Sequence, residues 1–322
     1  MTAVRTRLSI LVPIVALLAA PAVAQTYTER PYNPPVGSKW QIVSDSTATE
    51  NRPGAGNREQ RVQTRVDLSI DEKLPDGFFR VTYINRGVEV TGNTVAVKMV
   101  GDAYSAISNI PIRARLDKAG RPVEVENLAE VKAVMRGIVD KLVAKFESNP
   151  KVAAFMREML QSLLVAEGRD AATAYLEELP QLAAVQNIGL SPGAVRRDTE
   201  TTPSPVGGTT FKTVLTTRLD NYDDKTGAAR FVRKREFEKD ALREAVLDIV
   251  RKLAAAGDNK TITPEVLDMV KQINFSIEGE TIYNVDDGMT VWIDDREFMA
   301  ASVMGTTFTK QQKKTVAVRR QN

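Results

Sequence analysis

Three pairs of neighbouring aspartates are the residues whose type and spacing could do chemistry in this chain. They are Asp223-Asp224, Asp286-Asp287 and Asp294-Asp295. Two carboxylates held together can act as a general acid and base, or can bind calcium through their oxygens. However, the first pair lacks the glycine and glutamate positions of a calcium loop, and the second precedes Gly288 as in a short hairpin. The sequence therefore favours turn residues here, and predicts no metal site.

Histidine and cysteine are both absent from the 322 residues. Their absence excludes Ser-His-Asp and Cys-His nucleophile pairs, histidine-ligated zinc and thiolate metal sites. Paired carboxylates, a Ser-Lys dyad or oxygen-only binding of a cation remain open. The composition therefore favours a protein that is not an enzyme, and no cofactor is predicted.

Basic residues gather in residues 230–235 and again in residues 310–320. Binding of nucleic acid is one interpretation of such runs. Alternation along a strand, however, would place these charges on a solvated face, and lysines on a terminal strand can protect the edge of a sheet. We therefore predict that the chain does not bind nucleic acid.

Residues 61–71 form the clearest predicted strand, because apolar and polar residues alternate over eleven positions. Such alternation is typical of an antiparallel sheet with one covered face. Similar segments follow the turn at 74–77 and recur in two groups. The expected strands of the first group lie near 39–43, 78–90, 95–99 and 107–116, and those of the second near 209–221, 228–237, 275–285, 289–303 and 307–318.

Helices are expected between the two groups of strands. Asn127 begins the first, in which Met135 and Val139 belong to a broad apolar stripe. A second helix is expected from Pro150, and a third over residues 170–179. The sequence thus predicts an α+β fold with a large antiparallel sheet of about ten strands, covered on one face by amphipathic helices and able to curve into a half-barrel.

Residues 189–208 are rich in Pro, Gly, Ser and Thr, and form the strongest linker candidate. Two interpretations follow. Residues 38–320 could be a single α+β domain with an internal division near 189–208, or two smaller units split near Pro203. We favour the single domain, preceded by an extended, proline-rich leader over residues 25–37.

The first 24 residues have the pattern of a cleavable signal peptide, with a basic start, an apolar centre and small residues before a cleavage site between Ala24 and Gln25. The apolar centre is too short to span a membrane. Cleavage would remove Arg5 and Arg7 and no acidic residue, so that 42 basic residues remain against 41 acidic ones, a net charge of about +1. We predict a periplasmic protein without a transmembrane segment in its mature chain.

The turn Leu116-Asp117-Lys118-Ala119-Gly120-Arg121-Pro122-Val123, which leads into an amphipathic helix, completes a wider pattern. Together with the signal peptide and the strand meander, it resembles the exported bacterial half-barrel proteins of the lipoprotein-carrier type. The resemblance implies a curved sheet closed by helices around a hollow that holds lipid. It covers element order only, and no functional residue follows from it.

Two functions are consistent with these features. The first is a non-catalytic periplasmic protein that binds or carries a hydrophobic, lipid-like ligand between sheet and helices. The second is an envelope scaffold or protein-interaction module whose core is fully packed. The residues expected to line the ligand site of the first are Val62, Val66, Leu68, Phe79, Tyr83, Met135 and Val139.

Overall fold

The computed structural model describes most of the chain between residues 30 and 321. The described residues are 30–52, 54, 56–92, 108–144, 153, 157, 161, 164–203, 210–238, 244, 247, 274–303 and 306–321. The predicted signal peptide and its cleavage site between Ala24 and Gln25 lie outside these residues, as do the expected strand near 95–99 and most of the helix expected from Pro150.

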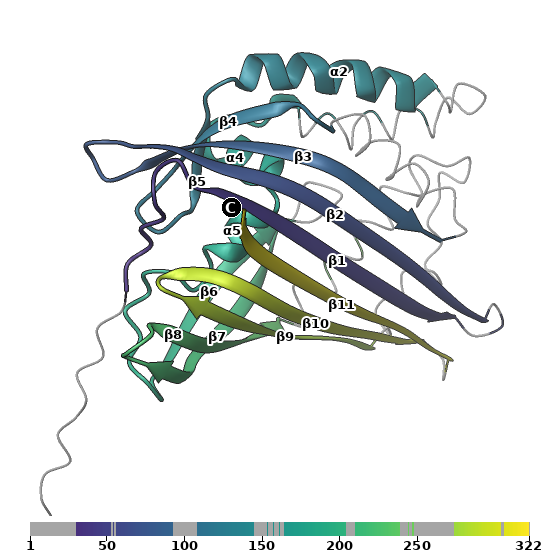
Figure 1. Cartoon of the computed structure of the whole chain (residues 1–322). Helices are drawn as coiled ribbons and strands as arrows, with labels where there is room; N and C mark the ends of the chain where they lie inside the picture. Colours follow the sequence, from purple (N-terminus) through teal and green to yellow (C-terminus); the bar gives the residue numbers. More distant parts are fainter. Residues whose placement is uncertain are drawn as a thin grey trace, which may run out of the picture.

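The described strands form one open antiparallel sheet of 11 strands (Figure 1). They are β1 (Lys39–Arg52), β2 (Gly56–Lys73), β3 (Phe79–Thr91), β4 (Pro111–Leu116), β5 (Pro122–Val125), β6 (Val195–Pro203), β7 (Thr210–Asp223), β8 (Ala228–Phe237), β9 (Asn274–Asp286), β10 (Met289–Val303) and β11 (Thr306–Gln321). Their order across the sheet is β5-β4-β3-β2-β1-β11-β10-β9-β8-β7-β6. The predicted large antiparallel sheet is therefore confirmed.

The first and last strands of the chain pair with each other in the middle of this sheet. Ile42 on β1 faces Val318 on β11, and the pairing continues from Lys39 to Asn51. From this centre, β1 to β5 step outward to one edge, and β6 to β11 step inward from the other. Both groups of strands thus belong to one continuous sheet, and β6 lies within the segment that the composition marks as a linker.

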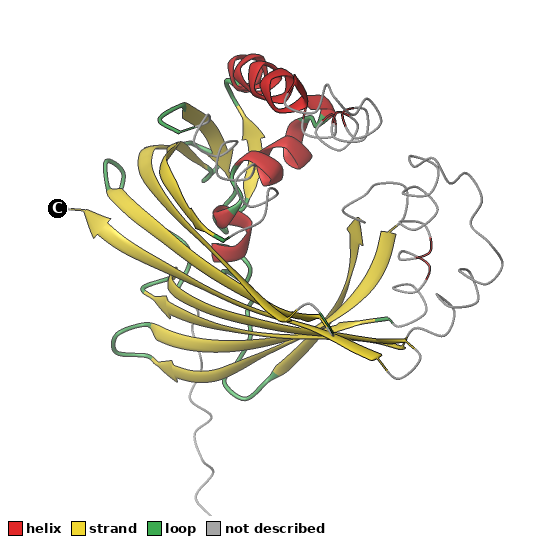
Figure 2. Cartoon of the chain, turned by 90° about the vertical axis from the view of Figure 1, so that its right-hand side faces the viewer, coloured by secondary structure: helices red, strands yellow, loops and turns green. Residues whose placement is uncertain are grey.

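The described residues between β5 and β6 contain three helices: α2 (Leu128–Ala144), α4 (Gly168–Tyr175) and α5 (Glu178–Leu182). In Figure 2 they follow one another from the β4–β5 edge toward the middle of the curved sheet. α4 packs on β5 and α5 on β10. A helical layer over a whole face of the sheet stays a prediction.

The helix expected over residues 170–179 is divided in two. Leu176 leaves the helical conformation, with φ −116° and ψ 53°, and a new helix begins at Glu178. This break allows both side chains to enter the core, where Leu176 is fully buried and Glu178 is 4% exposed. Burying these two side chains therefore stabilises the fold more than continuing the helix would.

The hydrophobic core lies on one face of the sheet, beside the helices. Along β2, buried Val66, Leu68 and Ile70 alternate with less buried neighbours, which confirms the predicted alternation. The core continues through Phe79 on β3 and reaches Phe231 on β8. One core therefore spans strands from both halves of the chain.

The described part of the leader is extended and binds three loops that lie between α5 and β10 in the chain, while Lys73 at the end of β2 donates a hydrogen bond to Asn33 at 2.7 Å. We call residues 30–36 the strap. Arg30 donates a hydrogen bond to Asp287 at 2.7 Å and another to the carbonyl of Lys225 at 3.1 Å. The backbone N–H of Tyr32 donates to Asn187 at 3.1 Å. The strap thus joins three loops that are distant in sequence.

The glycine of the β9–β10 hairpin makes room for the strap. Gly288 has φ +77°, and a Cβ added there would lie 2.4 Å from the carbonyl oxygen of Pro31. Asp287 beside it has φ +44°, which agrees with the short hairpin that the sequence predicts at Asp286-Asp287-Gly288. Only glycine combines that backbone conformation with so close an approach.

The buried tyrosines Tyr32 and Tyr283 make the stability of the fold decrease at alkaline pH. Burial disfavours the charged phenolate, and so raises the pKa of both Tyr32 and Tyr283 above the ordinary value. A raised pKa means that the folded protein holds these protons more tightly than the unfolded chain. This contribution to stability is complete below the unfolded pKa of about 10 and is lost as pH rises above it.

We therefore expect the free energy of unfolding to fall above pH of about 10, and we expect Tyr32→Phe to reduce the fall because it removes a phenol whose pKa is raised by burial. Urea unfolding at a series of pH values, with wild type and variant compared, measures the effect. An equal fall in both proteins would contradict the assignment to Tyr32.

Among the helices of the described chain, none is both long enough and apolar enough to cross a membrane.

Candidate functional site

The seven residues expected to line a hydrophobic site lie mostly in the packed core. Five belong to the main core cluster and are between 0% and 9% exposed, namely Val66, Leu68, Phe79, Tyr83 and Met135. Val139 packs in a smaller cluster with Val143 and Ala153. Val62, on β2, is partly exposed. None of the seven is among the described residues that line the large pocket below.

A buried carboxylate lies inside the main cluster. Glu178 of α5 accepts a hydrogen bond from the Thr64 hydroxyl at 3.0 Å and another from the Tyr83 hydroxyl. Tyr83 therefore binds a helix to β3 rather than facing an open hollow. This network fixes α5 on the sheet, where the Thr290 hydroxyl also donates to the carbonyl of Leu182 at 2.6 Å.

Two of the aspartate pairs lie at turns, as predicted, but the turn prediction is wrong for Asp294-Asp295, which lies within β10. Asp223 accepts hydrogen bonds from the Thr226 hydroxyl at 2.9 Å and from the Lys225 N–H at 3.0 Å, which lower its pKa. Asp294 and Asp295 are adjacent on β10 and have different partners, Arg296 and Thr281 respectively. In the described ranges, no group of three or more acidic residues is placed to hold a metal ion.

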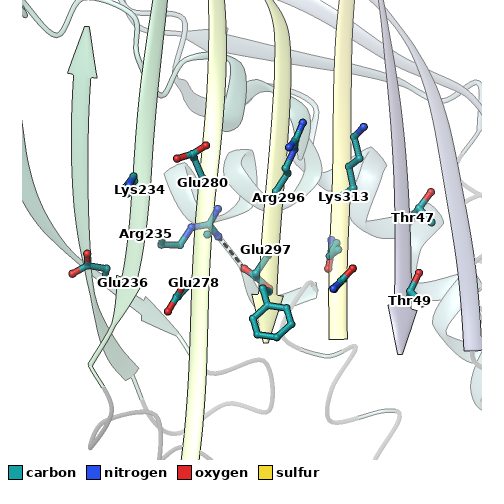
Figure 3. Close-up of a pocket in the computed structure, with 14 residues that line it drawn as sticks. Thr47, Thr49, Lys234, Arg235, Glu236, Glu278, Glu280, Arg296, Glu297 and Lys313 are labelled. Carbon is teal, nitrogen blue, oxygen red and sulfur yellow. Dashed lines mark ion pairs between the residues drawn. The ribbon is translucent and has the colours of Figure 1, made fainter. Parts of the chain in front are cut away.

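A pocket of about 1070 Å³ opens on the sheet among the described residues (Figure 3). Most of its lining residues belong to two rungs, a rung being a row of residues that face one another across neighbouring strands. The row between the two rungs also contributes to the lining, through Gln312, Glu297, Gly279 and Arg235. The first rung comprises Thr47, Lys313, Arg296, Glu280 and Lys234. The second comprises Thr49, Gln311, Phe298, Glu278 and Glu236. Both rungs cross β1, β11, β10, β9 and β8 in that order.

Strand alternation places both rungs on the face opposite the core. Tyr283 and Thr281 of β9 are buried on the core face, whereas Glu280 and Glu278, at the alternate parity, are exposed. Phe298 is also exposed, with 38% of its surface open to solvent. The pocket therefore combines charged side chains with one accessible aromatic ring.

The core face behind the pocket is polar as well. The last apolar rung joins Phe231, Tyr283, Ile293 and Val316. The next rung along the same strands comprises Arg233, Thr281, Asp295 and Lys314. Hydrophobic contact thus ends one rung before the pocket region, and cross-strand polar contacts take its place.

Arg235 links these strands through the space left by a glycine. Its guanidinium donates to Asp295 at 3.3 Å and lies 3.5 Å from Glu297, both on β10 (Figure 3). Gly279 of β9 lies between Arg235 and Glu297 in the register, and a Cβ there would be 3.4 Å from the Arg235 Cβ. The missing side chain lets the arginine cross β9, so the strands under the pocket are tied together.

The pocket charges differ in how they are compensated. Arg296 donates to Asp294 at 2.8 Å, and this hydrogen bond and the nearby carboxylate charges raise the pKa of the guanidinium. Lys313, Glu236 and Glu278 make no ion pair with any of the residues that the structure describes. These three charges are therefore available to a ligand.

Both basic runs singled out in the sequence contribute to this site, through Lys234 and Lys313. The interpretation of the C-terminal lysines as protection for a sheet edge is wrong, because β11 lies in the middle of the sheet and pairs with β1 and β10. Sequence reasoning did not single out Glu278, Glu280 or Phe298. The sequence showed only that these three residues lie in expected strands, and it gave no sign that they belong to a site.

Comparisons with known proteins show no family. No family model matches the chain, and no curated protein matches it. Among solved structures, DynF from the dynemicin biosynthesis pathway of Micromonospora chersina matches with a TM-score of 0.20 and 9% sequence identity, over 93% of this chain and 89% of that one. A TM-score of this size supports no inference about fold or function.

Proposed function

We propose that this chain is a non-catalytic binding protein whose ligand lies in the pocket formed by the two rungs. The observation that carries the proposal is the pocket itself, with a volume of about 1070 Å³, charges of both signs that make no ion pair with a described residue, and the exposed ring of Phe298. Ligand sites commonly pair an apolar contact with a few placed polar groups. The N-terminal pattern of a signal peptide supports a periplasmic location.

A lipid-like ligand between sheet and helices stays a prediction. Six of the seven residues expected to contact it are packed in core clusters. The described pocket instead offers mostly charged and polar side chains. A polar ligand with some apolar surface fits this lining better than an acyl chain does.

A second candidate is the envelope scaffold or protein-interaction module. The observation that favours it is the deep burial of core side chains among the described residues, where Phe79, Ile70 and Leu116 are at most 1% exposed. A scaffold would retain no small molecule, which separates the two proposals.

Native mass spectrometry of the full chain tests the proposed function. We expect protein purified from its own compartment to retain a small molecule, and Phe298→Ala to lose most of it because the ring no longer contacts the ligand. Phe308→Ala is the matched control, since Phe308 is similarly exposed at 43% but does not line the pocket. Recovery of the released molecule unchanged after incubation with the protein would agree with a non-catalytic role.

Two results would contradict the proposal. Wild-type protein that retains no small molecule would favour the scaffold. Equal retention by Phe298→Ala and wild type would place the ligand outside the pocket.

A further inference from the structure

The pocket carries balanced charge. Its described lining includes four basic residues, Lys234, Arg235, Arg296 and Lys313, and four acidic ones, Glu236, Glu278, Glu280 and Glu297. A site of this composition gives no net attraction to a strongly anionic or strongly cationic molecule. Its selectivity must come from the positions of the positive and negative side chains within the pocket.

The negative end of the pocket lies on β8 and β9. Glu236 and Glu278 face each other directly across these strands. Like charges in such a position repel and destabilise the strand pair. Neither glutamate has an ion pair within the described residues. A cationic group placed between them would relieve this repulsion.

The positive end lies on β10 and β11. Lys313 and Arg296 face each other across these strands, so this pair also brings like charges together. Asp294 compensates Arg296 through their 2.8 Å ion pair, whereas Lys313 has no ion pair with a described residue. An anionic group beside Lys313 would supply the missing partner.

The two ends are separated diagonally across the sheet. They are two strands apart and one rung apart, which corresponds to about 12 Å between their backbone midpoints at the usual strand spacing and rise. Phe298 occupies the second rung on β10, between Gln311 and Glu278, and is open to solvent. A ligand that spans both ends would pass this ring.

We propose that the pocket recognises a zwitterionic molecule with its cationic and anionic groups about 10–12 Å apart, joined by a partly apolar segment, and that a short peptide with free ends is of this class. The amino group would bind between Glu236 and Glu278, the carboxylate at Lys313, and the middle side chain on Phe298. This inference rests on the proposed function and names the class of ligand for the same site.

The tripeptide Gly-Phe-Gly is a suitable probe, because three extended residues span about 10 Å. Calorimetric titration of the full chain would compare the free tripeptide with its N-acetylated, C-amidated and doubly blocked forms. We expect each single block to weaken binding about fivefold, the usual upper size of one exposed ion pair. Binding of the free tripeptide should also weaken as salt concentration rises.

Two pocket variants identify which end binds which group. In the double variant Glu236→Gln/Glu278→Gln, acetylation of the peptide should have little further effect, and in Lys313→Gln, amidation should have little further effect. Glu89→Gln and Arg319→Gln are matched controls on exposed strand positions outside the pocket, and both should bind as wild type does.

The outcomes separate this inference from the proposed function. Equal binding of all four peptides would overturn charge recognition while leaving a binding pocket in place. No binding by any peptide would overturn the zwitterion inference. If native mass spectrometry also detected no retained molecule, the proposed function would fail with it.

Discussion

Replacement of Tyr32 by alanine is expected to lower the free energy of unfolding by about 3–5 kcal/mol, the usual cost of removing a large aromatic side chain from a core. Tyr32 is 7% exposed, and its ring meets that of Phe79 edge to face at a centroid distance of 5.3 Å. It belongs to the strap, so its loss also weakens the contact between the leader and the loops that the strap joins. Urea unfolding monitored by circular dichroism measures the change.

Two variants control for the chemistry of this substitution. Tyr32→Phe keeps the ring and should retain most of the stability at neutral pH. Trp292→Ala removes a larger side chain that is 39% exposed, and should cost much less than Tyr32→Ala. An unfolding midpoint unchanged in Tyr32→Ala would show that the strap does not stabilise the sheet.

Replacement of Glu178 by alanine is expected to cost about 2–5 kcal/mol, because two hydroxyls would each lose an acceptor inside the core. Thr64 and Tyr83 both donate to this carboxylate, and Glu178 is 4% exposed. The substitution would also release α5 from β2 and β3. Thermal and urea unfolding would both report the loss.

Glu178→Gln is expected to lose less, since its amide oxygen can still accept one of the two hydrogen bonds. Glu177→Ala is the neighbouring control. Glu177 is about half exposed and lies 3.9 Å from Lys314, so its removal should change stability by less than about 1 kcal/mol. Equal stability of Glu178→Ala and wild type would contradict a structural role for the buried network.

Local sequence pattern predicted the strands well, because alternation and turn residues are encoded within short segments. Residues 61–71 alternate and lie in β2, and the Asp-Gly turn at 287–288 joins β9 to β10. The helix break at Leu176 was not predicted, since it depends on burial against the sheet. Likewise, β6 lies in a segment whose Pro, Ser and Thr content suggests a linker.

Strand order depends on contacts that no local pattern contains. Nothing near Ile42 or Val318 indicates that β1 and β11 pair, yet this pairing places the C-terminal lysines in the centre of the sheet. The candidate site depends on the same register. Lys234 and Lys313 belong to runs visible in the sequence, but Glu278 becomes relevant only once β8 and β9 are aligned.

The hydrophobic site expected from the sequence shows the same limit. Met135 and Val66 were correctly placed on apolar faces, and both are buried in the main cluster. A stripe of apolar residues indicates burial, but it does not tell whether the space beside it is filled. How these faces pack against their neighbours could therefore be learned only from the three-dimensional structure.

The most direct test of the pocket as the ligand site compares backbone amide NMR spectra of the full chain as purified from its own compartment and after unfolding, dialysis and refolding. Loss of the ligand should change signals along the two rungs, above all near Phe298, Glu278 and Lys313. Identical spectra, or changes centred on the buried residues Val66 and Met135, would contradict the proposed site.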